Sequence, residues 1–188
     1  MRKETSYYPE IQTFIEQQLA SNFRAAKHHD LHVYWGIGEL KKNMLRIIRE
    51  NPDICACMTS FADRLPPLDL DIFAVITDAS NFELLILEVK RMNSVGLKEW
   101  SQLLGYCLVS GAKYGLLVNI DNGASERLSD ILITEGHLSL IRTIIDSSYR
   151  NHYLGCMSWD SRTHDFIYNN LGYIKSLSQL SNILASEF

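Results

Sequence analysis

Three charged side chains stand at the ends of two apolar stretches that are close together in the sequence. Asp71–Thr77 and Phe82–Lys90 are rich in β-branched and large apolar residues, and the residues between them favour a turn. Side chains alternate along a strand, so Glu88 and Lys90 point the same way, about 6–7 Å apart. A hairpin would bring Asp71 next to them. Two carboxylates and an ammonium would then meet at one end of a sheet.

This charged group has two interpretations, because charges beside a buried strand are costly unless they pair or bind a metal. In the first, Lys90 pairs with Glu88 or Asp71 and closes the sheet edge. In the second, the two carboxylates hold Mg²⁺, which takes oxygen ligands at roughly 2.0–2.1 Å and keeps several waters. The lysine would then orient or deprotonate an attacking water, or stabilise charge on a phosphate oxygen.

At these residues the chain resembles the PD-(D/E)xK nuclease superfamily, which includes many restriction endonucleases, Holliday-junction resolvases and RecB-type nuclease domains. In that pattern an Asp opens one strand and Glu-x-Lys ends the next, as Asp71, Glu88 and Lys90 do in order and approximate spacing. Ser101–Cys107 extends the likeness, because it resembles the Gln-x-x-x-Tyr motif of the RecB-like branch. The likeness covers roughly residues 38–119.

The chain departs from that pattern just before Asp71. The proline that usually precedes the Asp is displaced here to Pro66 and Pro67. Asp69 would share a strand face with Asp71, so it is a rival ligand for the metal.

The resemblance implies a Mg²⁺-dependent nuclease that hydrolyses phosphodiester bonds in DNA, with Mn²⁺ able to substitute. It implies that Asp71, Glu88 and the Val89 carbonyl hold the metal while Lys90 assists the attack. Gln102 would orient the water or a phosphate, and Glu39 would be a further metal ligand. Three residues would bind the substrate: Tyr106, Lys98 and Arg91. The alternative is a catalytically idle nuclease-like fold that binds nucleic acid or a protein.

The assignments on helices keep a second interpretation. Glu39 opens a helix just before the sheet, and it is either an extra metal-side carboxylate or an acid that favours the helix dipole. Lys98, Gln102 and Tyr106 fall four residues apart and form a polar stripe on one helix. That stripe either faces the substrate or is an ordinary solvent-exposed surface.

The surrounding elements predict an α/β fold with a central mixed β-sheet flanked by helices. This agrees with the restriction-endonuclease-like core, of order α-β-β-β-α-β, that the resemblance implies. One domain spans 1–188, with a helical lead-in (1–37), a catalytic core (38–120) and a C-terminal extension (121–188). Periodicity and turn residues predict helices at 8–23, 39–50, 97–110, 138–149 and 175–187, and strands at 54–61, 71–77, 82–90, 114–119, 130–134, 153–159 and 165–169.

The net charge and the distribution of apolar residues narrow the class of protein. A net charge of −4 is unlike a protein that coats DNA, so any nucleic-acid contact must come from a local patch. No apolar run approaches the roughly 20 residues of a membrane span, and no charged-then-apolar leader opens the chain. We therefore expect a cytoplasmic protein without membrane contact.

The histidines and cysteines do not form a recognisable metal site. The histidine-rich segment 28–32 indicates a solvated connection, because nothing nearby completes a ligand set. Cys55 and Cys57 are two apart, whereas Cys107 and Cys156 are isolated, which is unlike a zinc or iron–sulfur pattern. Reduced thiols are expected.

We expect an endonuclease that works as a homodimer, since two sites related by a two-fold axis cut both strands of a duplex. The expected dimer surface lies in the C-terminal extension, where apolar residues appear in excess. These are Leu154, Trp159, Phe166 and Tyr168.

Overall fold

The structure, a computed structural model, describes residues 2–27, 30–52, 54, 57–78, 80–145 and 148–188. Over these residues the elements are, in chain order, η1 (Glu4–Tyr7), α1 (Tyr8–Lys27), β1 (His32–Glu39), α2 (Leu40–Glu50), α3 (Cys57–Arg64), β2 (Asp69–Thr77), β3 (Phe82–Lys90), α4 (Leu97–Ser110), β4 (Tyr114–Ile120), α5 (Glu126–Thr134), η2 (Gly136–Ser139), β5 (Leu140–Ile145), β6 (Ser148–Asp160), β7 (Asp165–Gly172) and α6 (Leu177–Glu187).

The described strands form one mixed sheet of seven, in the order β1-β2-β3-β4-β6-β5, with β7 also paired to β6. The first three strands pair antiparallel, whereas β3–β4 and β4–β6 pair parallel. β5 and β7 run antiparallel to β6. Helix α4 forms the crossover from β3 to β4, because two parallel strands cannot be joined by a tight turn and need a long connection. The expected mixed sheet flanked by helices is therefore confirmed.

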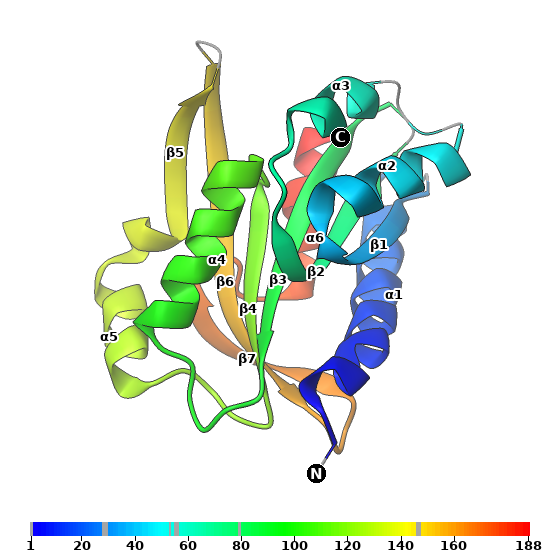
Figure 1. Cartoon of the computed structure of the whole chain (residues 1–188). Helices are drawn as coiled ribbons and strands as arrows, with labels where there is room; N and C mark the ends of the chain where they lie inside the picture. The colour runs from blue at the N-terminus through cyan, green and yellow to red at the C-terminus, as the bar shows by residue number, and fades with distance from the viewer. Residues whose placement is uncertain (1, 28–29, 53, 55–56, 79, 146–147) are drawn as a thin grey trace.

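Helices cover both faces of this sheet (Figure 1). α1 and α6 pack on one face, and α2, α3, α4 and α5 pack on the other. Alternation along β2 divides its side chains between the two cores: Ile72 and Ala74 join the first, whereas Phe73 and Val75 join the second. Most of β3 is buried on both faces, which explains its nearly continuous apolar run.

Most of the elements predicted from periodicity are present. The helices expected at 8–23, 39–50, 97–110 and 175–187 correspond to α1, α2, α4 and α6. The strands expected at 71–77, 82–90 and 114–119 correspond to β2, β3 and β4, and the expected hairpin across residues 160–162 joins β6 to β7.

Three predicted elements are wrong. The strand expected at 54–61 is replaced by helix α3, because Met58 and Ala62, four residues apart, are the ones that turn to the core. The strand expected at 130–134 lies inside helix α5. The helix expected at 138–149 is replaced by η2, β5 and the start of β6, with residues 146 and 147 outside the described chain.

The missing first strand lies in the expected lead-in. β1 runs across the boundary drawn between residues 37 and 38 and pairs with β2. Gly36 lies against the ring of Phe73, where a Cβ would meet the ring at 2.2 Å, so any larger residue would have to displace that buried ring. Of the histidine-rich segment, His28 and His29 lie outside the described residues, and His32 opens β1.

Two expectations about the periphery need correction. Leu154, Trp159 and Phe166 are buried in the protein's own core, so they offer nothing to a dimer surface; Tyr168 alone of the expected set is exposed. Cys57 is disulfide-bonded, whereas Cys107 and Cys156 are free and buried. Cys55 lies outside the described residues.

Within the described residues, no helix combines the length and apolar character needed to cross a bilayer.

Candidate active site

The charged site lies where strands β2 and β3 separate. Their described ladder ends at the pair Ile72 and Leu87. One residue further, the Asp71 side chain takes the place of a backbone partner: its Oδ2 accepts from the Val89 N–H at 3.0 Å and from the Lys90 ammonium at 2.9 Å. The carboxylate is thus fixed by the backbone of the neighbouring strand.

Glu88 is the buried member of the site. Its side chain is 1% exposed, and Oε1 lies 2.5 Å from Lys90 Nζ. That contact lacks hydrogen-bond geometry, and no other described residue donates to this buried oxygen. Burial, and then the charges of Asp71 and Glu4, raise the pKa of the Glu88 carboxyl, although Lys90 opposes the shift. Glu88 therefore lies where added positive charge would stabilise its ionised form.

Lys90 joins the two carboxylates. Burial alone would lower its pKa, but the contacts with Asp71 and Glu88 outweigh burial and raise the pKa of Lys90. The side chain consequently keeps its proton at neutral pH and acts as a donor. Of the roles considered from the sequence, the contacts of this ammonium with two carboxylates suit the stabilisation of negative charge.

The Val89 carbonyl points into the same opening. In an extended strand the N–H and C=O of one residue face the same side, and the Val89 N–H faces Asp71. No residue of β2 pairs with Val89 among the described residues. Two carboxylates and one carbonyl therefore converge where the strands part.

The N-terminal segment contributes two residues that sequence reasoning missed. Glu4 accepts from the Tyr8 hydroxyl at 3.3 Å and from the Arg91 N–H at 2.9 Å. Burial, followed by the charges of Asp71 and Glu4, raises the pKa of Tyr8. A third carboxylate and a phenol therefore border the site. Their helical spacing of four was visible in the sequence, but nothing there linked them to a strand more than 80 residues away.

Asn119 fixes the chain just beyond the site. It is fully buried on β4, opposite Lys90 in the parallel ladder. Its side chain accepts from the Met92 N–H at 3.2 Å and donates to the carbonyls of Met92 and Gly123 at 3.0 Å. The backbone that follows Lys90 is thereby held in place by one amide.

Glu39 and Asp69 stay outside this cluster. Glu39 caps helix α2, where its carboxylate accepts from the N–H groups of Lys41 and Lys42 at 3.1 and 2.5 Å. This favours the helix-terminus interpretation of Glu39 over the metal. Asp69 is exposed and stands opposite Glu39, whereas Asp71 makes the contacts with the neighbouring strand.

The polar stripe on α4, formed by Lys98, Gln102 and Tyr106, lies on the same side of the sheet as the site but, within the described chain, is not bonded to it. Gln102 Nε2 donates to the Tyr106 hydroxyl at 3.0 Å, both side chains are half-buried, and Lys98 is exposed. Among the described residues, no hydrogen bond joins them to Asp71 or Glu88. α4 does pack on the face toward which Glu88 alternates, so the stripe and the site share one side of the sheet.

Arg91 is directed to the N-terminal segment. Its guanidinium donates to the Arg2 carbonyl, lies over the Tyr7 ring at 5.1 Å and stands 3.7 Å from Asp121. These contacts bind the start of the chain to the end of β3, so an Arg91 role in substrate binding would require it to exchange partners.

The donor set fits Mg²⁺ in one respect and falls short in another. Within the described chain, no group of three His, Cys, Asp or Glu residues is arranged to hold a metal ion. Mg²⁺, however, is usually bound through one or two carboxylates together with waters and substrate phosphates. Asp71, the Val89 carbonyl and the buried carboxylate of Glu88 fit that description.

Comparison of the chain with protein-family models, characterised proteins and solved structures finds no match. The function is therefore inferred from the chemistry of the site itself.

Proposed function

We propose that the protein is a divalent-metal-dependent nuclease that hydrolyses phosphodiester bonds in DNA. The observation that supports this most strongly is the convergence of Asp71, Glu88 and Lys90 where β2 and β3 part, with more carboxylate than ammonium charge. A structural ion pair needs no excess negative charge in a buried position, because such an excess is destabilising. The excess suits a group that binds a cation.

The residues divide the work by their chemistry. Asp71, Glu88 and the Val89 carbonyl would hold the metal, which supplies Lewis-acid polarisation of the phosphate and a more acidic bound water. Mn²⁺ would substitute for Mg²⁺, since both accept oxygen ligands. Lys90 keeps its proton and would turn its ammonium toward the scissile phosphate, where negative charge develops.

The neighbouring side chains would position the substrate. Gln102 stands on α4 over the same face of the sheet, where its amide can orient water or a phosphate oxygen. Tyr106 supports that amide through its hydroxyl. Glu4 adds negative charge close to Glu88, which would strengthen attraction of a cation.

Cleavage of closed circular, linear and branched DNA in Mg²⁺ or Mn²⁺ tests the proposal. The matched pair is Asp71→Asn against Asp69→Asn, which remove the same charge two residues apart. We expect the first to abolish cleavage and the second to retain it. Folded protein that leaves every substrate intact in both metals would contradict the nuclease and leave a nucleic-acid- or protein-binding fold.

A homodimer acting as an endonuclease belongs to the same proposal. Exposed apolar residues for it include Ile144 on β5 and Tyr149 on β6, which are 70% and 73% exposed, and Ile167 and Tyr168 on β7. Light scattering measures the mass in solution. A monomer that degrades linear ends and spares closed circles would instead indicate an exonuclease.

A further inference from the structure

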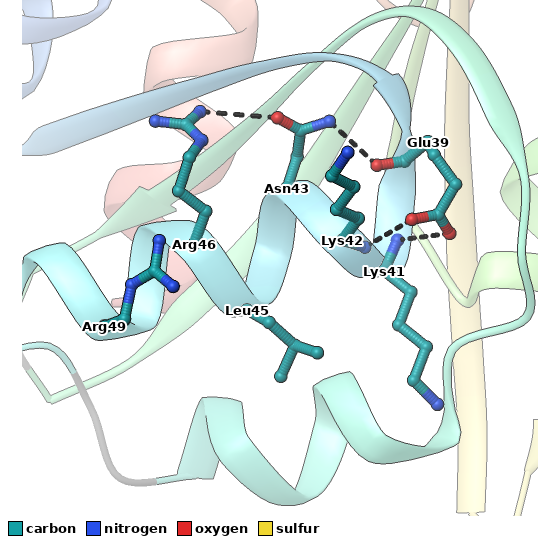
Figure 2. A pocket seen from close by; sticks show the side chains of 7 residues that line it. All are labelled: Glu39, Lys41, Lys42, Asn43, Leu45, Arg46 and Arg49. Atoms are coloured by element: carbon teal, nitrogen blue, oxygen red, sulfur yellow. Dashed lines mark hydrogen bonds between the residues drawn. The ribbon is translucent and has the colours of Figure 1, made fainter.

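Helix α2 carries a stripe of positive charge on a chain whose net charge is −4. Lys42, Arg46 and Arg49 stand at positions i, i+4 and i+7, which places them along one side of the helix. They line a surface hollow of about 490 Å³ together with Glu39, Lys41, Asn43 and Leu45 (Figure 2). The opposite side of α2 is the apolar one, where Leu40 and Met44 pack in the core.

The positive charge of this stripe is only partly neutralised. Arg46 bonds Glu50 at 3.0 Å, and Arg49 is 4.0 Å from the same carboxylate. No described carboxylate pairs with the exposed ammonium of Lys42; Glu39 accepts from its backbone N–H instead. The cations therefore outnumber their carboxylate partners.

The stripe begins close to the candidate active site. The β1–β2 register places Glu39 opposite Asp69, two residues along the strand from Asp71. Two strand residues span about 6–7 Å and the perpendicular strand separation is about 5 Å, so Glu39, the residue before α2, lies roughly 8 Å from Asp71. α2 also packs on the face toward which Glu88 and Lys90 alternate. The cations thus continue away from the site on its own side of the sheet.

The dimensions of the stripe match a phosphodiester backbone. From Lys42 to Arg49 the helix rises about 10 Å, at 1.5 Å per residue. Phosphates of one duplex strand advance by 3.4 Å each along the duplex axis, so a stripe of this length laid parallel to that axis passes about three of them. Arg46 and Arg49 present planar guanidinium groups, which suit phosphate oxygens.

We infer that the basic side of α2, formed by Lys42, Arg46 and Arg49, binds the phosphate backbone of duplex DNA beside the active site. This inference rests on the proposed function, which supplies DNA as the partner. It also explains how an acidic chain retains a polyanion: the carboxylates of Asp71 and Glu88 repel phosphates, and α2 provides a compensating surface on the same side of the sheet.

The inference is tested by equilibrium binding of a fluorescent DNA duplex in EDTA, where cleavage does not interfere. Lys42→Ala/Arg49→Ala removes two exposed cations and spares Arg46, which also donates to the Trp35 carbonyl. We expect binding about tenfold weaker near 100 mM salt, and a slope of log affinity against log salt that is lower by about 2. Thermal unfolding verifies that the fold is retained.

The matched control is Arg127→Ala/Lys175→Ala, which removes the same charge from exposed residues on α5 and before α6. We expect it to change affinity less than twofold. Equal losses in the two double variants, or no DNA binding by the wild-type protein, would overturn the interface. Binding to vesicles containing phosphatidylserine in place of DNA would overturn it as well.

The outcomes separate this interface from the nuclease proposal. Selective loss of binding in the α2 variant without any metal-dependent cleavage would retain the interface and reject the nuclease. Cleavage that persists with unchanged DNA affinity in the α2 variant would retain the nuclease and reject the interface.

Discussion

Strand β3 carries a carboxylate near each end, half-buried at Glu83 and buried at Glu88, and the two are compensated differently. Glu83, at the start, lies 2.8 Å from Arg150 and 3.5 Å from Lys113, which in turn reaches Glu187 at 2.7 Å. Among the described residues, two cations thus serve two carboxylates. The network ties β3, β6 and α6 together and leaves little net charge.

At the other end of the strand, Glu88 shares a single ammonium with Asp71. Lys90 lies 2.5 Å from Glu88 and 2.9 Å from Asp71, and Glu4 adds a further carboxylate nearby. Over the described residues this end of β3 carries excess negative charge, in a position where Glu88 is 1% exposed.

The comparison separates two uses of charge within the fold. Balanced ions such as those around Glu83 join elements of the fold, whereas the unbalanced set around Glu88 is stable only if something else supplies positive charge. Residues that lower stability in this way are commonly retained for function. The balance of charge, more than burial alone, distinguishes the candidate site.

The sharpest test of this difference is catalytic. Glu88→Gln and Lys90→Met should each reduce cleavage by orders of magnitude, whereas Lys113→Met should retain the activity of each folded molecule. Because the site residues act as one unit, a Glu88→Gln/Lys90→Met double variant should be little worse than either single one. Initial rates on a radiolabelled duplex measure this, and comparable losses in Lys113→Met would erase the distinction.

The second test compares two lysines by stability. Lys113→Met should cost about 2–3 kcal/mol, below the usual 3–5 for a broken buried pair because Lys113 is 17% exposed. Mg²⁺ should not restore that loss. Lys90→Met should also destabilise, but Mg²⁺ should restore its stability, since a cation replaces the lost ammonium. Denaturant unfolding of both variants with and without Mg²⁺ measures these changes in stability. If Mg²⁺ changed the stability of the two variants equally, the two lysines would not differ in role.

A smaller effect is expected from Gln102→Ala. The amide would position groups in the transition state, so turnover should fall several-fold to a hundredfold while substrate affinity changes little. Tyr106→Phe, which removes the hydroxyl that accepts from Gln102, should reproduce part of that loss. Steady-state kinetics measure both variants, and unchanged turnover would return the α4 stripe to an ordinary solvent-exposed surface.

The smallest effect concerns pH. Burial raises the pKa of Glu88, so the folded protein takes up a proton there more readily than the unfolded chain. The stability that protonated Glu88 contributes is present below the ordinary carboxyl pKa, and it is lost as pH rises through the raised pKa of Glu88. Glu88→Gln should therefore gain stability relative to wild type between mildly acidic and neutral pH. Unfolding free energies at both pH values test this; a constant difference would contradict it.

The parts of the fold predicted from sequence are those with strong local patterns. β2, β3 and β4 are continuous apolar runs, and α4 ends at Gly111, whose φ of 72° favours glycine. β1 was missed because it is a partly exposed edge strand with glycines and no apolar run. The residues of α3 combine aromatic and sulfur-containing side chains, so tertiary packing, not local preference, decides for a helix.

The candidate site divides in the same way. Asp71, Glu88 and Lys90 could be grouped because strand alternation and a short hairpin relate them directly. Glu4 and Tyr8 could not, since only the packing of α1 against the sheet brings them to β3. The assignment of Glu39 required the cap geometry of α2, which sequence alone left open.

The bond from the Val89 amide to the Asp71 carboxylate provides a reporter of the site. An amide proton held by a side chain exchanges with solvent when that side chain releases it, whereas its neighbours in the ladder exchange when strands open. The Val89 resonance would therefore follow the carboxylate itself. Nuclear magnetic resonance at this one amide would report the binding of a cation, a proton or a substrate to Asp71. The measurement needs no substitution in the site.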